Sequence, residues 1–180
     1  YALNLPSDPE FVNFNFPRRL KAAFDGPSTW DVATCRNPFE IYEFYVDIEW
    51  HFCRYLHNNK GLSWVSSLYL SNAIKEFLNH IPKGYRPKQT FTFDELFVEE
   101  YICRRCQNIF WLNGIMVCSI LKSIYYFADY LVEHEIIDIS MATKIKQSCV
   151  NLFVKSRDSI DTTNAARMLF KRSEDLFGGE

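Results

Sequence analysis

The sequence predicts an all-α fold, and three observations support this prediction. Glycine and proline are scarce (6 and 7 of 180 residues), and four of the prolines precede residue 30, which leaves a long proline-poor body. Apolar residues recur at steps of three and four, the period of an amphipathic helix. Residues 106–121, CQNIFWLNGIMVCSIL, carry no charge at all. We therefore expect a helical bundle in which amphipathic helices surround one hydrophobic central helix.

The chain length fits one domain, which we expect to span residues 38–180. Residues 1–37 mix turn residues with scattered aromatics, as in PSDPEF and FDGPSTW. We expect them to form an irregular arm packed on the body, with RRLKAAF (18–24) as a short helix.

The first long helix is expected over residues 38–58. Asn37 suits the N-cap and Pro38 the first turn. Gly61 is expected to end the helix, with Trp64 folding back to cover its last turn. Its apolar face is formed by Ile41, Phe44, Tyr45, Ile48, Phe52, Tyr55 and Leu56.

A second helix is expected over residues 66–80, before three residues that break the chain: Pro82, Gly84 and Pro87. Its apolar face is formed by Leu70, Ala73 and Phe77, with Ile74 and Ile81 as further candidates. A third helix is expected from about residue 92 to 110, capped by Thr92 or Asp94.

The uncharged run supplies the central helix, expected over residues 113–134. At 16 residues it is shorter than the roughly 20 apolar residues that a membrane span needs. A further helix is expected over 140–156, with Ile145, Cys149, Leu152 and Phe153 facing inward. A last helix is expected to start at the cap signal DTTN (161–164) and to carry Ala165, Met168, Leu169 and Leu176.

Composition and motifs argue against several classes of function. The formal net charge is −2 with no basic stripe, so nucleic acid is not expected as a partner. The four histidines lie far apart, CRRC (103–106) is a lone CxxC, and no glycine-rich phosphate loop is present. We expect no catalytic residues, no metal site, no cofactor and no enzymatic activity. The six cysteines suit buried, reduced thiols in an intracellular protein.

Four segments in order, covering about residues 39–177, resemble the Bcl-2 family of apoptosis regulators. EFYVDIEWHFCRYLHNNKGLSW resembles the BH4 helix, which ends in a glycine followed by a tryptophan three residues later, here Gly61 and Trp64. The resemblance implies that Trp64 packs across the helix end into the fold. Leu56 lies one residue further from the glycine than is usual. SIDTTNAARMLF occupies the place of BH2, although the usual Gly-Gly-Trp is absent.

LSNAIKEF resembles the BH3 segment but departs from it at two positions. Four positions match: Leu70, Ala73, Glu76 and Phe77. Ile74 replaces the small glycine, and Lys75 replaces the aspartate that pairs with an arginine of the partner. Because Lys75 reverses that charge, the resemblance implies a survival protein rather than a killing ligand.

WLNGIMV resembles the BH1 signature Asn-Trp-Gly-Arg. Gly114 matches, Asn113 stands in the place of the tryptophan unless the register shifts by one residue, and Ile115 replaces the arginine. That arginine grips the aspartate of a bound BH3 helix, and such a charge-assisted bond contributes about 1.5–3 kcal/mol. A helix bound here must rely more on apolar anchors or supply a different polar contact.

The resemblance implies a pro-survival regulator that binds the BH3 helix of pro-death partners, or another amphipathic helix, in a surface groove. The groove residues that it implies are Phe77, Ile81, Tyr85, Ile102, Cys106, Asn113, Gly114 and Ile115. The implied location is the cytoplasm and the mitochondrial outer membrane surface, with membrane association through a tail outside this chain.

Three alternatives remain open at this point. One is a Bax-like effector that permeabilises membranes, against which the degraded BH3 segment argues. Another is a helical scaffold or dimerisation domain that binds an unrelated peptide. The third is a groove that is filled by its own side chains or by a second copy of the chain in a homodimer.

Overall fold

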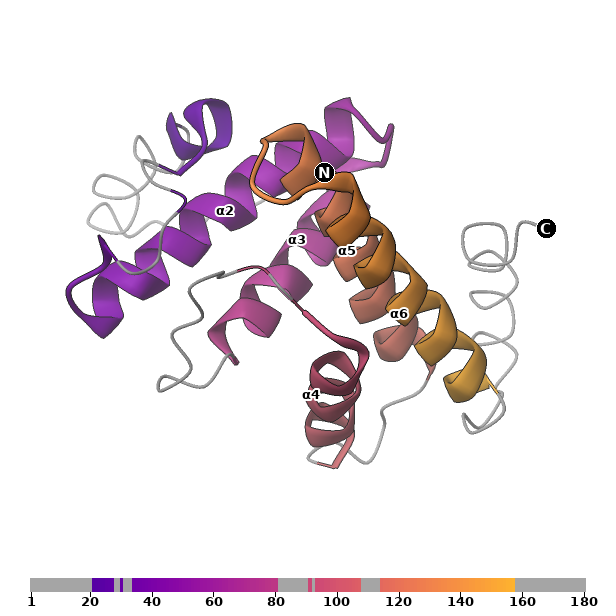
Figure 1. Cartoon of the computed structure of the whole chain (residues 1–180). Coiled ribbons are helices and arrows are strands. Elements are labelled where there is room, and N and C mark those ends of the chain that lie inside the picture. Colours follow the sequence, from indigo (N-terminus) through magenta and orange to yellow (C-terminus); the bar gives the residue numbers. More distant parts are fainter. Residues whose placement is uncertain are drawn as a thin grey trace, which may run out of the picture.

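The computed structural model describes residues 21–27, 30, 34–80, 91, 93–107 and 114–157, and all of its regular structure is helical. Residues 21–25 are helical. The longer helices are α2 (Pro38–Asn58), α3 (Trp64–Asn79), α4 (Glu95–Gln107), α5 (Gly114–Glu133) and α6 (Ile139–Arg157) (Figure 1). The predicted all-α class is confirmed. The helix expected from residue 161 and the first 20 residues of the expected arm lie outside the described residues.

Helix α2 has the bounds that its sequence predicts. The Asn37 side chain accepts hydrogen bonds from the backbone N–H groups of Phe39 and Glu40, both at 3.0 Å, and Pro38 occupies the first turn. After the helix ends, Gly61 adopts φ +66°, and the N–H of Leu62 reaches back to the carbonyl of Leu56 at 3.2 Å. A side chain at Gly61 would meet nothing within 4 Å, so this turn needs the glycine for its backbone conformation alone.

Helix α3 begins two residues earlier than expected because Ser63 caps it. The Ser63 Oγ accepts a hydrogen bond from the N–H of Ser66 at 3.2 Å. Trp64 does stack across the end of α2, on the ring of His57 at 4.1 Å, but 55% of its surface is exposed. The prediction that Trp64 packs into the fold is therefore wrong. The His57 Nδ1–H donates to the carbonyl of Leu62 at 2.7 Å. His57 and Trp64 therefore cover the turn that follows α2 on its outer side.

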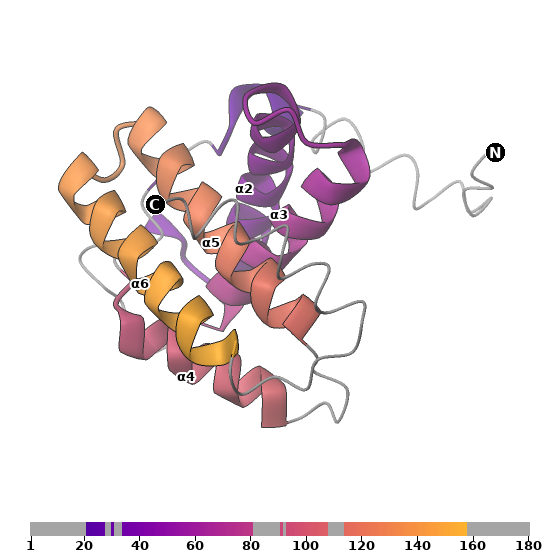
Figure 2. The same ribbon diagram turned by 90° about the vertical axis from the view of Figure 1, so that its right-hand side faces the viewer.

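Helix α5 lies in the middle of the fold. It packs against α6 on one side and against α2 and α3 on the other, while α4 packs chiefly against α6. Figure 2 shows this order from α6 through α5 to the α2–α3 pair, with α4 crossing along one end. Tyr130, Phe127 and Leu131 of α5 are fully buried, together with Phe52 of α2. None of the described helices combines the length and apolarity that a membrane span requires.

Helices α4 and α6 begin at aspartate caps. Asp94 accepts a hydrogen bond from the N–H of Phe97 at 2.8 Å, and Asp138 accepts one from Met141 at 2.7 Å. The four residues expected to face inward from α6 are all buried: Ile145, Cys149, Leu152 and Phe153.

A buried ion pair joins α2 to α3. The Lys75 Nζ lies 2.9 Å from Glu49 Oε2, and only 15% and 9% of the two side chains are exposed. Lys75, the residue that reverses the charge expected of a BH3 segment, is thus directed into the fold. Ile74 beside it is fully buried, where a glycine would leave a void between the helices.

Candidate functional site

A cluster of aromatic rings, here called the α3–α4 cluster, fills the junction between the end of α3 and α4. It consists of Phe77, His80, Phe93, Phe97 and Tyr101. The Phe77 ring is fully buried and makes edge-on contacts with Phe93, Phe97 and Tyr101, at centroid distances of 4.8, 5.5 and 5.0 Å. The His80 ring lies edge-on to Tyr101 at 5.1 Å. Such edge contacts are favourable but individually modest, at about 0.5–1.5 kcal/mol each.

Local sequence explains why three of these rings lie on the same side of α4. Phe93, Phe97 and Tyr101 are spaced by four residues, which places them on one side of α4 and its first turn. The opposite side of α4 faces outward, where Leu96 is 73% exposed. Polar contacts from Glu95 to Asn151 and Lys155 tie the start of α4 to α6. The side of α4 that faces α3 is therefore aromatic and the side that faces α6 is partly polar.

One polar atom in the α3–α4 cluster has no partner among the described residues. The Nε2 of His80 is buried and makes no hydrogen bond there. An unsatisfied buried polar group costs about 1–3 kcal/mol, so a hydrogen-bonding group brought to this position would be stabilised.

The groove residues implied by the family resemblance fall into three groups: buried core residues, residues at helix ends, and residues outside the described part of the chain. Phe77 and Ile102 belong to the same hydrophobic core and are 0% and 7% exposed, so neither lines an open surface. The rings of the α3–α4 cluster cover Phe77 and account for its burial. Cys106 lies in the last turn of α4, and Gly114 and Ile115 form the start of α5. Three residues lie outside the described part of the chain: Ile81, Tyr85 and Asn113.

Three rings of the α3–α4 cluster were missed by sequence reasoning. Phe93, Phe97 and Tyr101 were not among the groove candidates, although their spacing at i, i+4 and i+8 in a predicted helix was a usable signal. The pairing of that stripe with Phe77 depends on how two helices meet, which no local pattern encodes.

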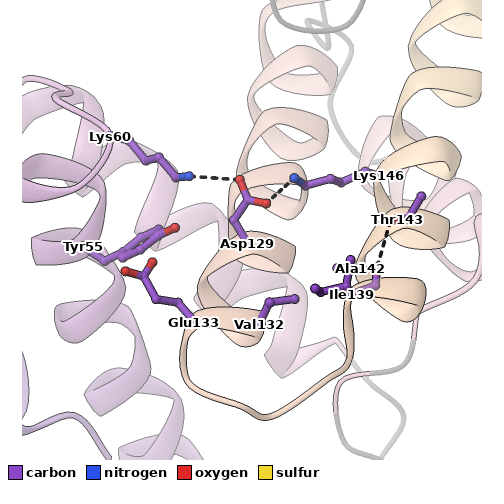
Figure 3. Close-up of a pocket in the computed structure, with 9 residues that line it drawn as sticks. All are labelled: Tyr55, Lys60, Asp129, Val132, Glu133, Ile139, Ala142, Thr143 and Lys146. Carbon is purple, nitrogen blue, oxygen red and sulfur yellow. Dashed lines mark hydrogen bonds and ion pairs between the residues drawn. The ribbon is translucent and has the colours of Figure 1, made fainter.

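A pocket of about 440 Å³ lies between the end of α2, the end of α5 and the start of α6 (Figure 3). Its lining residues are Tyr55, Lys60, Asp129, Val132, Glu133, Ile139, Ala142, Thr143 and Lys146. Asp129 pairs with two cations, Lys60 at 3.0 Å and Lys146 (Figure 3). These pairs bridge the segment after α2 to α5, and α5 to α6.

The remaining polar groups of this pocket are also paired internally. Glu133 accepts a hydrogen bond from Asn59 Nδ2 at 3.1 Å and lies beside Tyr55 (Figure 3). Burial raises the pKa of Tyr55, and the negative charge and hydrogen bond of Glu133 raise it further. Tyr55 therefore stays protonated, which makes it unsuited to act as a base at neutral pH. With its charges paired across three elements, the pocket stabilises the fold and offers no activated nucleophile.

Metal binding finds no support in the described residues, where no group of three or more histidine, cysteine or acidic side chains is placed to hold an ion. Cys103 of the CRRC sequence is an exposed free thiol.

No family model, curated protein or solved structure matches this chain. The function therefore has to be argued from the helices and from the α3–α4 cluster.

Proposed function

We propose that this protein is a pro-survival regulator of apoptosis that binds the BH3 helix of pro-death partners at the α3–α4 cluster. The observation that carries this proposal is the order of the helices. A BH4-like α2 that ends at Gly61 is followed by a BH3-like α3, by α4, and then by the hydrophobic α5 in the middle of the fold. This order agrees with the arrangement that the sequence resemblance implies.

The proposed mechanism is sequestration. The apolar anchors of a partner helix enter between α3 and α4 and take over contacts that Phe77 now makes with Phe97 and Tyr101. Each buried anchor contributes about 1.5–3 kcal/mol, whereas each displaced edge contact costs about 0.5–1.5 kcal/mol. Three or four anchors therefore outweigh the loss of two ring contacts, and the surplus must also offset the translational and rotational freedom that is lost on association. A partner held in this way at the mitochondrial outer membrane cannot permeabilise it.

Polar recognition must differ from that of the family, because Ile115 replaces the arginine. We assign the polar contact with the partner helix to the buried Nε2 of His80, which has no hydrogen-bond partner among the described residues. A hydrogen bond to it from the partner helix would satisfy a buried atom and fix the orientation of that helix.

The experiment is calorimetric titration of the domain with a panel of BH3 peptides. We expect submicromolar binding of at least one peptide, weakened at least tenfold by Phe97→Ala, because Phe97 is a partly buried ring at the edge of the cluster. Gly114→Phe should also weaken binding, since the resemblance implies close approach of the partner at this glycine. Leu68→Ala is the matched control, because Leu68 is 48% exposed on the outer side of α3.

A second candidate is a helical scaffold that binds an unrelated peptide, and the outer side of α3 favours it. Four large apolar residues there are 48–80% exposed: Trp64, Val65, Leu68 and Tyr69. Exposed apolar patches of this kind are typical of interaction sites. Binding that Leu68→Ala abolishes and Phe97→Ala leaves intact would assign the function to this surface and reject the α3–α4 cluster.

A further inference from the structure

Two histidines from different helices meet beside a buried tyrosine, away from the α3–α4 cluster. The rings of His51 in α2 and His134 at the end of α5 lie 5.0 Å apart. The Nδ1 of His51 shares a hydrogen bond of 2.7 Å with the hydroxyl of Tyr130, whose side chain is fully buried. The Tyr130 ring also contacts both histidine rings edge-on, at 5.6 and 4.7 Å.

The chain that precedes α2 docks on this pair of histidines. We call residues 21–27 together with Trp30 the N-terminal segment; its helical turn lies against α2 (Figure 1). Trp30 stacks on the His134 ring at 5.5 Å and 25°, and contacts Tyr130 at 5.7 Å. Gly26 packs on the other histidine: a Cβ at Gly26 would lie 3.4 Å from the His51 ring.

Arg54 adds a third attachment point one turn along α2. Its guanidinium lies 3.9 Å from the centre of the Phe24 ring, and its Nη1 donates to the Ala23 carbonyl at 3.4 Å. Histidine and arginine side chains therefore hold the N-terminal segment at both of its ends.

The charged groups around the pair favour neutral histidines. Burial, together with the charges of His134 and Arg54, lowers the pKa of His51 to about 4, and only the charge of Asp25 opposes this shift. Burial also lowers the pKa of His134, against the opposing charge of Glu133. At pH 7 both rings are uncharged and can stack and pack without repulsion.

We propose that the His51–His134 pair is a pH-sensitive latch that holds the N-terminal segment on α2 and α5 while both rings are neutral and releases it when they are protonated. Protonation places two positive rings 5.0 Å apart, next to the guanidinium of Arg54. It also fixes the His51 Nδ1 as a donor, so the hydroxyl of the buried Tyr130 can only accept from it and can no longer donate to it.

The direction and range of the effect follow from proton linkage. The docked state binds fewer protons than the released state, whose histidines titrate near 6.5, so docking is strongest and independent of pH above that value. It weakens as the pH falls from about 6.5 toward 4, by up to tenfold per pH unit for each histidine. This inference does not depend on the proposed function.

Hydrogen exchange of the Gly26 amide tests the latch, because this N–H donates to the Ala22 carbonyl at 2.9 Å within the docked segment. The experiment uses the full chain, and exchange rates are corrected for the intrinsic pH dependence of exchange. We expect the protection factor of the Gly26 amide to fall at least tenfold between pH 7 and pH 4.5. Amides in the interior of α2 should keep their protection over the same range. The slope of log protection against pH should exceed one.

Variants test whether protonation of the two histidines, rather than packing alone, causes the pH dependence of docking. His51→Gln and His134→Gln each remove one titrating ring, so each should reduce the slope to one or less, and the double variant should abolish it. His57→Gln is the matched control, since it removes another histidine from α2 and should leave the slope unchanged. An unchanged slope in the double variant, or a parallel loss of protection in α2 of the wild type, would each overturn the proposal.

Discussion

The ion pair between Glu49 and Lys75 gives the sharpest prediction about stability. The two charges lie 2.9 Å apart between α2 and α3, and 9% and 15% of their side chains are exposed. Lys75→Met retains most of the apolar stem but leaves the Glu49 carboxylate buried without its cation. Breaking a fully buried pair in this way costs about 3–5 kcal/mol. Because some exposure remains at both side chains, we expect a loss of about 2–3 kcal/mol.

A double-mutant cycle isolates the pair from the packing around it. Glu49→Gln should cost about 2 kcal/mol, since it leaves the Lys75 ammonium unpaired. The double variant should lose about 2–3 kcal/mol, no more than Lys75→Met alone, which corresponds to a coupling free energy of about 2 kcal/mol. Urea denaturation followed by circular dichroism at pH 7 measures all three variants against the wild type.

Lys155→Met serves as the control for this cycle. It removes a lysine that also pairs with a glutamate, Glu95, but 59% of the Lys155 side chain is exposed. Its effect on the free energy of unfolding should lie within the error of the extrapolation to zero urea. Additive single variants, or a Lys75→Met variant as stable as the wild type, would refute the conclusion that this pair locks α3 onto α2.

Three further predictions concern single positions. Glu135 has φ +59° at the end of α5, a left-handed backbone conformation that glycine adopts without strain. Glu135→Gly should therefore raise the free energy of unfolding by about 0.5–1 kcal/mol in the same urea assay, and a decrease would contradict the presence of strain at this residue. Asp129→Asn should lower it by about 1 kcal/mol, because two partly exposed lysines lose their shared partner; no change would show that these pairs are energetically neutral. Cys103 is exposed, whereas burial raises the pKa of the Cys149 thiol to about 12. Iodoacetamide at pH 7.5, read by peptide mass spectrometry, should therefore label Cys103 and spare Cys149, and labelling at equal rates would contradict the burial of Cys149.

The bounds of the helices were predictable wherever strong local signals coincide. Asn37 and Pro38 fix the start of α2, and its predicted end at residue 58 is confirmed. The start of α3 was placed two residues late because the serine at position 63, rather than the start of the apolar pattern, caps the helix. The interior of α6 was predicted correctly because a period of 3.6 residues determines which side chains share a face.

The contacts between helices were not predictable, because they join residues that are distant in the sequence. His51 and Tyr130 are 79 positions apart, and nothing in either local pattern points to the other. Lys75 was interpreted as a reversed charge on a partner-binding helix, but its partner is Glu49 within the same chain. The BH4 resemblance implies Trp64 inside the fold, whereas stacking on one histidine suffices to hold it at the surface.

The central claim is that a partner helix binds at the junction of α3 and α4. An NMR titration of the labelled domain with the BH3 peptide that binds most tightly tests this claim most directly. We predict that the largest chemical-shift changes fall on Phe77, Phe97 and Tyr101 and on the start of α5, with small changes at Leu68. Changes confined to the outer side of α3, or no change with any peptide of the panel, would contradict the claim.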